Sequence, residues 1–124
     1  MESNVTPIGT TAPAAVNEFD AIACPDPRYE GPFRILMRAI KQSCQEKGAE
    51  RHGTDECFED QPTSFIGRVV GRGFGIGQAM KKLIEAERLE DSGKLEAANA
   101  ERLGAINYIT YGIYQSERKK KAKR

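Results

Sequence analysis

A glycine-rich stretch with two arginines is the first place in this 124-residue chain where residue types and spacing suit ligand chemistry. Glycine lets a backbone approach a phosphate closely, and a helix that begins after such a stretch offers free N–H groups and a positive dipole. Arginine side chains can add bidentate contacts to the phosphate. A Walker loop is excluded, because no Lys-Ser or Lys-Thr pair ends the stretch. We therefore predict a site for a nucleotide or another phosphorylated small molecule, built from Arg68, Arg72, Gly73 and Gly75.

The same glycines allow two other interpretations. Gly67, Gly71, Gly75 and Ala79 recur every four residues, so a continuous helix would present a smooth strip for another backbone to approach. Each helical glycine costs about 0.8–1 kcal/mol relative to alanine, however, and five of them favour a break. A packing strip, a hinge and an anion-binding loop therefore all remain open over residues 67–77.

Carboxylates form the second candidate site. Glu87 and Glu90, at i and i+3, share one face of the helix that follows the glycines, and Glu101 lies on the next helix. Proteins commonly hold Mg²⁺ through one or two carboxylates while substrate phosphates supply further ligands. Basic residues are interleaved with these acids, so ordinary solvated surface charge is the alternative interpretation: Lys81, Lys82 and Arg88.

Histidine and cysteine offer little further chemistry. His52 precedes Cys57 by five residues, which matches no zinc motif, and a His52–Asp55 acid–base pair has no other support. The odd number of cysteines, with Cys24 and Cys44 far from each other, predicts free thiols in a reducing cytoplasm. No signal-peptide pattern opens the sequence, and no apolar run reaches the ~20 residues that span a bilayer. We expect a cytoplasmic protein with no membrane partner.

Helical periodicity dominates the elements that must position these residues. Apolar side chains at i, i+3, i+4, i+7 and i+11 predict a first helix over about 32–47, with Gly48 as its stop. A polar connector over 49–62 follows, with a short helical turn near Phe58 and a new helix opened by Pro62.

The second half of the chain predicts two longer helices. One begins near Gln78 and ends at Ser92-Gly93, while the stretch 65–76 before it could be extended. The other covers about 94–117 and carries an apolar stripe beside a stripe of tyrosines, Tyr108, Tyr111 and Tyr114. An apolar surface this wide suggests a central helix or one shared with a neighbouring subunit. No strand alternation is persuasive, so the predicted fold class is all-α, a small helical bundle.

The two ends differ from the body in composition. Residues 1–17 are small, polar and proline-containing, which predicts a disordered N-terminal segment. The helical domain then covers 18–117, and 118–124 form a basic C-terminal tail. The chain has a net charge of +1, and without the six basic residues of the tail it would carry −5. This distribution excludes a uniformly basic nucleic-acid-binding fold, although the tail can contact nucleic acid or an acidic partner, or solubilise the chain.

The order of these parts resembles phage-borne relatives of the MazG-like all-α nucleotide pyrophosphohydrolases. The similarity covers about residues 31–117 and is carried by Leu-Ile-Glu-Ala-Glu-Arg-Leu-Glu at 83–90 and Ala-Glu-Arg-Leu-Gly-Ala-Ile-Asn-Tyr at 100–108. It implies a four-helix bundle that forms an oligomer and gathers Mg²⁺ over a nucleoside triphosphate. Glu87, Glu90 and Glu101 would match the acids of that family, but Gly104 stands where the family has its last Asp.

Two functions therefore remain open, and the sequence leaves undecided whether the chain is an enzyme. The first is a helical protein that binds a nucleotide or phosphate ligand, either a Mg²⁺-dependent diphosphohydrolase or a degenerate relative. The alternative is a non-catalytic phage-type accessory or inhibitor protein that binds a protein or nucleic-acid partner through the tyrosine stripe or the basic tail. A homo-oligomer is expected in either case.

Overall fold

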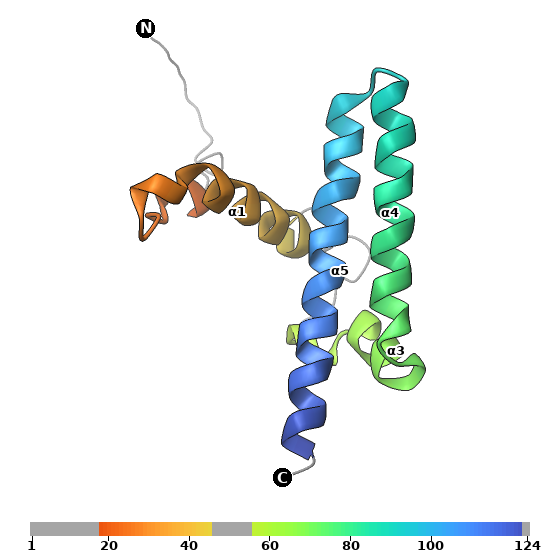
Figure 1. Ribbon diagram of the computed structural model, residues 1–124. Helices are drawn as coiled ribbons and strands as arrows, with labels where there is room; N and C mark the ends of the chain where they lie inside the picture. The colour runs from red at the N-terminus through yellow and green to blue at the C-terminus, as the bar shows by residue number, and fades with distance from the viewer. Residues whose placement is uncertain (1–17, 46–55, 123–124) are drawn as a thin grey trace, which may run out of the picture. The chain divides into compact units, whose positions relative to one another are not determined.

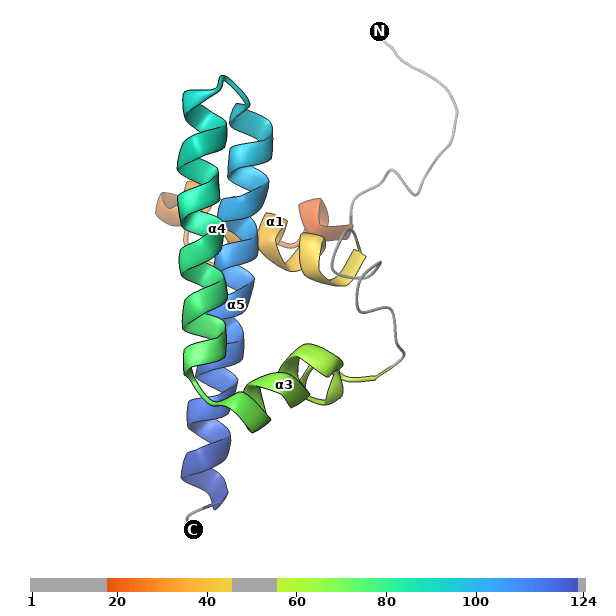
Figure 2. The ribbon, with the colours of Figure 1, turned by 90° about the vertical axis from the view of Figure 1, so that its right-hand side faces the viewer.

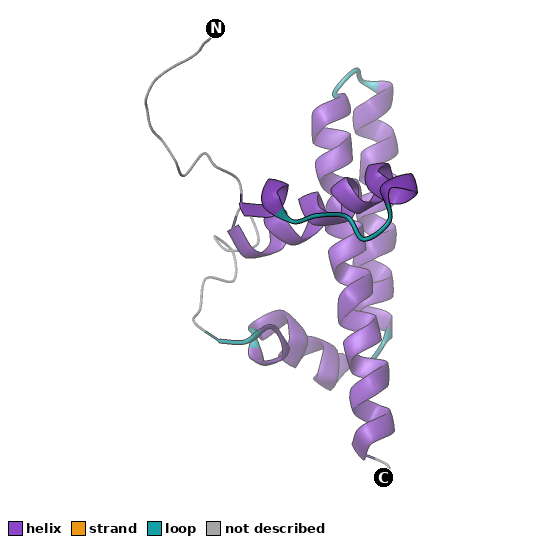
Figure 3. Ribbon diagram, turned by 90° about the vertical axis from the view of Figure 1, so that its left-hand side faces the viewer, coloured by secondary structure: helices purple, strands orange, loops and turns teal. Residues whose placement is uncertain are grey.

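The computed structural model describes residues 18–45 and 56–122, with side chains as far as Arg118. These ranges contain helices, turns and bends but no strand, as Figure 3 shows. The predicted all-α class is therefore confirmed, with the helices forming a small bundle. The predicted disordered segment 1–17, the Gly48 helix stop and the His52–Asp55 pair all lie outside the described residues.

The chain divides into two compact units, residues 1–37 and 38–124. In the first unit, the short 3₁₀ helices η3 (Glu18–Ala21) and η4 (Pro27–Tyr29) precede the first half of α1 (Glu30–Gln45), and the rest of α1, from residue 38, belongs to the second unit. Asp26 caps η4 by accepting the backbone N–H of Arg28 at 3.0 Å, and hydrogen bonds from Arg28 lower the pKa of this carboxyl. Arg34 joins the two ends of the unit, because its guanidinium donates to the carbonyl oxygens of Phe19 and Ile22, at 3.0 and 2.7 Å.

The second unit is built on an antiparallel hairpin of α4 (Gly73–Asp91) and α5 (Leu95–Ala122), which lie side by side in Figures 1 and 2. The predicted stop at Ser92-Gly93 is confirmed. Gly93 has φ +81°, its N–H donates to Glu90 O, and the N–H of Lys94 donates to Leu89 O, both at 2.9 Å. This pattern is a Schellman C-cap, which reverses the chain within a few residues.

Small residues fill the interface between α4 and α5. Ala86 and Ala98 are completely buried, at 0% exposure. Other buried small residues lie four and seven residues from each other or from Ala86 and Ala98, with one adjacent pair on α5: Gly75, Ala79, Gly104 and Ala105. Helix axes approach more closely when the contacting side chains are small. No large side chain within the described ranges is completely buried, so this interface contributes little hydrophobic burial for its length.

The glycine-rich stretch contains a sharp break between two helices. α3 (Pro62–Val70) ends at Gly71, which has φ +103° and donates its N–H to Gly67 O at 2.8 Å. The extended interpretation of 65–76 is therefore wrong, and α4 begins at Gly73 rather than near Gln78. Because only glycine adopts a positive φ of this kind at low cost, Gly71 fixes the break.

Two further glycines on either side of the break serve close packing. A Cβ on Gly75 would lie 3.1 Å from the backbone oxygen of Tyr108, and a Cβ on Gly67 would collide with the side chain of Gln115. The break at Gly71 excludes one continuous strip over residues 67–79, although Gly75 packs closely against the α5 backbone, as the packing interpretation expects. The hinge and the anion-binding loop stay predictions.

Aromatic stacking anchors η5 (Phe58–Asp60) and α3 to α5. The Phe58 ring stacks on Tyr111 with centroids 4.4 Å apart and lies 5.1 Å from Tyr114. Ser64 on α3 donates its hydroxyl to Phe58 O at 2.7 Å. In the same unit, Asn107 on α5 donates to the carbonyl oxygen of Ala39 on α1 at 3.0 Å.

The hairpin interface makes a direct prediction about side-chain size. Ala98→Leu should destabilise the protein by about 1–3 kcal/mol, because the added atoms would enter a closely packed interface. The neighbouring Ala97 is exposed, so Ala97→Leu is a matched control expected to change stability by less than about 0.5 kcal/mol. Urea unfolding followed by circular dichroism measures both. Equal effects from the two substitutions would contradict the small-residue interface.

Candidate functional site

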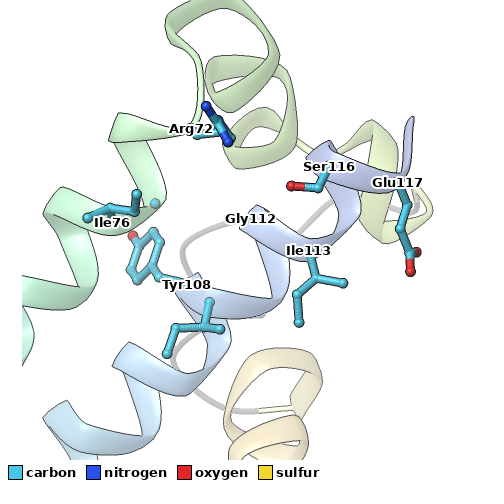
Figure 4. Close-up of a pocket in the computed structure, with 9 residues that line it drawn as sticks. Arg72, Ile76, Tyr108, Gly112, Ile113, Ser116 and Glu117 are labelled. Atoms are coloured by element: carbon cyan, nitrogen blue, oxygen red, sulfur yellow. The ribbon is translucent and has the colours of Figure 1, made fainter. Parts of the chain in front are cut away.

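A groove of about 490 Å³ runs between α4 and α5 near the start of α4. Arg72, Gly75 and Ile76 line one side, and residues of α5 line the other, as Figure 4 shows: Tyr108, Ile109, Gly112, Ile113, Ser116 and Glu117. Two of the four sequence-predicted ligand residues, Arg72 and Gly75, therefore lie at this groove. The glycine sits under the Tyr108 backbone, so its structural role is to let the helices approach.

The other predicted arginine has a different environment. Arg68 donates to the carbonyl oxygen of Glu59 at 2.7 Å, and its guanidinium lies 5.8 Å from the centroid of the Phe65 ring. Arg118 donates to the same Glu59 oxygen at 3.2 Å. Arg68 thus joins α3 to the segment before it, and neither Arg68 nor Gly73 is among the residues that line the groove.

The carboxylates predicted to hold a metal are matched by cations on the opposite helix. Arg102 on α5 reaches Glu87 at 2.9 Å and Glu90 at 2.6 Å, which confirms that these two acids share a face of α4. The hydrogen bonds that Arg102 donates to Glu90, and then to Glu87, raise the pKa of Arg102. Glu101 lies 3.5 Å from Lys82. Among the residues that the structure describes, no three Asp, Glu, His or Cys side chains are placed to hold one metal ion.

The tyrosine stripe takes part mainly in packing within the chain. Tyr111 is buried against Phe58, and this burial raises the pKa of its phenol, although a hydrogen bond with Thr63 opposes the shift. Tyr108 meets the edge of Phe74 with centroids 6.0 Å apart, and the Lys82 ammonium lies 5.8 Å from its ring centroid. Tyr114 is the most exposed of the three.

The cysteines form no disulfide, and none belongs to the groove. Cys24 is partly buried, with its thiol 3.0 Å from the carbonyl oxygen of Asp26. Cys44 and Cys57 are exposed. The predicted free thiols are consistent with this arrangement.

Large aliphatic side chains lie exposed on one side of the hairpin, which the sequence analysis did not predict. Ile76, Met80 and Leu83 recur at i, i+4 and i+7 on α4, and Ile109 and Ile113 recur at i and i+4 on α5. The groove brings Ile76 together with both isoleucines of α5, so the two rows belong to the same side of the hairpin. We call this surface the hairpin stripe: Ile76, Met80, Leu83, Ile84, Ile109 and Ile113, exposed by 60%, 57%, 47%, 65%, 55% and 54%.

The sequence contained a signal for this arrangement. A helix with Met80, Leu83 and Ile84 has an obvious apolar side, and these residues would be assigned to the core. Beside them, however, Gly75, Ala79 and Ala86 recur with heptad-like steps of four and seven residues. The row of small residues faces α5, and the row of large aliphatic residues is therefore left exposed to solvent.

Comparisons with known proteins add no assignment to this geometry. The sequence matches no protein-family model, no curated protein and no solved structure. Within the described ranges, no helix combines the length and apolar character needed to cross a bilayer.

Proposed function

We propose that this chain is a non-catalytic interaction protein that acts by docking the hairpin stripe onto another polypeptide. One observation carries the proposal: apart from Tyr111, the buried residues of the hairpin helices are alanine and glycine, while six large aliphatic side chains are exposed on one side. Such a protein acts by binding another polypeptide, and the hairpin stripe is its binding surface.

The energetics of the stripe support docking. Complete burial of a large aliphatic side chain contributes about 1.5–3 kcal/mol, and the stripe holds six of them at 47–65% exposure. Soluble monomers rarely leave contiguous apolar patches of this kind uncovered, and larger patches usually mark interaction sites. Covering the stripe with a complementary surface would therefore yield substantial binding energy.

The charged groups support a non-catalytic role. Glu87 and Glu90 both engage Arg102, and Glu101 lies within ion-pair distance of Lys82. These pairs join α4 to α5 across the hairpin, so they stabilise the scaffold that presents the stripe. A catalytic carboxylate pair would have to be released from these cations first.

Site-specific photo-cross-linking tests the proposal. A photoreactive phenylalanine analogue at Met80 should cross-link to a polypeptide in expressing cells, because Met80 lies within the docking surface. The same analogue at Ala97, which is exposed outside the stripe, is the matched control and should give at least several-fold less product. Mass spectrometry identifies the product. Equal or no cross-linking at the two positions would contradict the proposal.

Binding of a phosphorylated small molecule is the second candidate, in line with the MazG-like resemblance. The supporting observation is that Arg72 and Tyr108 line one groove, since a guanidinium suits a phosphate and an aromatic ring can stack on a nucleobase. The residues that would hold Mg²⁺ in this candidate, Glu87, Glu90 and Glu101, are ion-paired, so the metal would compete with Arg102 and Lys82.

A thermal-shift screen with nucleotides, with and without Mg²⁺, tests this second candidate. A ligand that binds the native protein at one hundred times its Kd stabilises it by about 2.7 kcal/mol, which is readily measured. Arg72→Gln should abolish the shift, whereas Arg88→Gln, on an exposed arginine outside the groove, should leave it unchanged. The absence of a shift with every nucleotide would eliminate the candidate.

A further inference from the structure

We propose that the polypeptide bound by the hairpin stripe is a second copy of this chain, paired antiparallel so that the hairpin turn of one copy lies over the α3–α4 break of the other. This inference rests on the proposed function, because it identifies the partner of the same surface. Three features of the molecule lead to it: the geometry of the stripe, the area of the hairpin side, and the distribution of charge along the hairpin.

The stripe is suited to a partner of the same shape. Its residues come from two adjacent antiparallel helices on either side of the α4–α5 groove. Two such surfaces placed face to face would bury their aliphatic rows in a layer between four helices. Among the described residues of one chain no large side chain is completely buried, and a core of large side chains would then form between the two copies.

The available area agrees with a stable dimer. A helix of 19 residues, the length of α4, is about 28 Å long, and two packed helices are about 18–20 Å wide. One side of the hairpin therefore covers roughly 500 Å² in projection, and its corrugated accessible surface is larger. A standard interface buries about 800 Å² per partner, which exceeds this projected area, so the whole corrugated side of the hairpin would have to be buried.

Charge is strongly segregated along the hairpin. Residues 85–102, around the turn, contain six acidic and three basic side chains. Residues 62–84 contain four basic and no acidic side chains, and residues 103–124 contain six basic and one acidic. The turn half is therefore acidic, and the half that holds the α3–α4 break and the end of α5 is basic.

This segregation selects the antiparallel pairing. A two-fold axis near the middle of the stripe places the acidic turn half of each copy over the basic half of the other. Parallel pairing would place like charges together and would be penalised by repulsion. Arg72 illustrates the point, because it lies at the break and would face the half of the partner that contains residues equivalent to Glu87 and Glu90.

Sedimentation equilibrium of the full chain tests self-association. The wild-type protein should sediment as a dimer, and Met80→Glu should weaken dimerisation at least 100-fold because it places a charge in the buried layer. Ala97→Glu adds the same charge outside the stripe and should remain a dimer. A dimer that persists in Met80→Glu, with circular dichroism confirming the fold, would overturn the assignment of the stripe.

Arg72→Glu provides a second variant that leaves the aliphatic rows intact. It should weaken the dimer roughly 10-fold at low salt and less at high salt, because ions screen the attraction between the two halves. Unchanged affinity at low salt would overturn the antiparallel arrangement, since that arrangement places residue 72 against acidic groups. This variant also remains informative if Met80→Glu fails to fold.

The orientation can be measured with one spin label per copy. Ser92 lies at the hairpin turn and is exposed, so it can be replaced by a labelled cysteine in a Cys24→Ser, Cys44→Ser, Cys57→Ser background that sedimentation shows to remain dimeric. Met80 and Ser92 are separated by about 18 Å along the helix, so antiparallel copies should place their labels roughly 35–40 Å apart. Parallel copies would place them within about 25 Å, and that result would overturn the proposal.

These outcomes separate the inference from the proposed function. A monomeric wild-type chain whose Met80 position cross-links to a different polypeptide would overturn self-pairing and leave the interaction function standing. A monomeric chain with no cross-link at Met80 would overturn both. A dimer whose spin labels lie roughly 35–40 Å apart, and whose association is weakened by Met80→Glu, supports both self-pairing and the interaction function.

Discussion

The close packing of α4 on α5 through small residues is the constraint on which the rest of the structure depends. Gly75, Ala86 and Ala98 bring the two backbones together, and Tyr108 O lies directly above Gly75. An interface of alanines removes little apolar surface from water, because each methyl group is small. The same packing turns the larger aliphatic side chains outward. The close approach of the two helices therefore gives the hairpin little buried apolar area inside and an apolar surface outside.

Electrostatic and conformational features hold this hairpin in place. The Schellman cap at Gly93 fixes the turn, and the positive φ of Gly71 fixes the break before α4. Arg102 joins the helices through Glu87 and Glu90 near the turn. The carboxylates that resemble a metal site are therefore explained as part of the scaffold, and the surface that they support is the hairpin stripe. We propose this stripe as the binding surface because it joins exposed large aliphatic side chains of both hairpin helices.

The sequence predicted the parts of this fold that depend on local chemistry. Pro62 and Gly93 marked helix ends correctly, and the i, i+3 spacing of Glu87 and Glu90 placed both on one face. The predicted start of α4 was wrong, because the low helix propensity of glycine favoured a later start, whereas α4 includes Gly73, Gly75 and Gly77. Of these three, only Gly75 packs closely against α5. Arg102 as the partner of both acids could not be predicted without the register of the two helices. Periodicity marks Met80 and Ile84 as part of an apolar side of the helix, but it does not show whether this chain or another covers that side.

The most direct test of this account is the dependence of the melting temperature on protein concentration. If the hairpin completes its core only against a second copy, dilution shifts the equilibrium towards unfolded monomers, and the melting temperature should fall by a few °C for each tenfold dilution. Circular dichroism over a hundredfold range of concentration measures this shift. A melting temperature that stays the same across that range would show that one chain is stable alone, and would contradict the central claim that the exposed stripe is half of an interface between two copies.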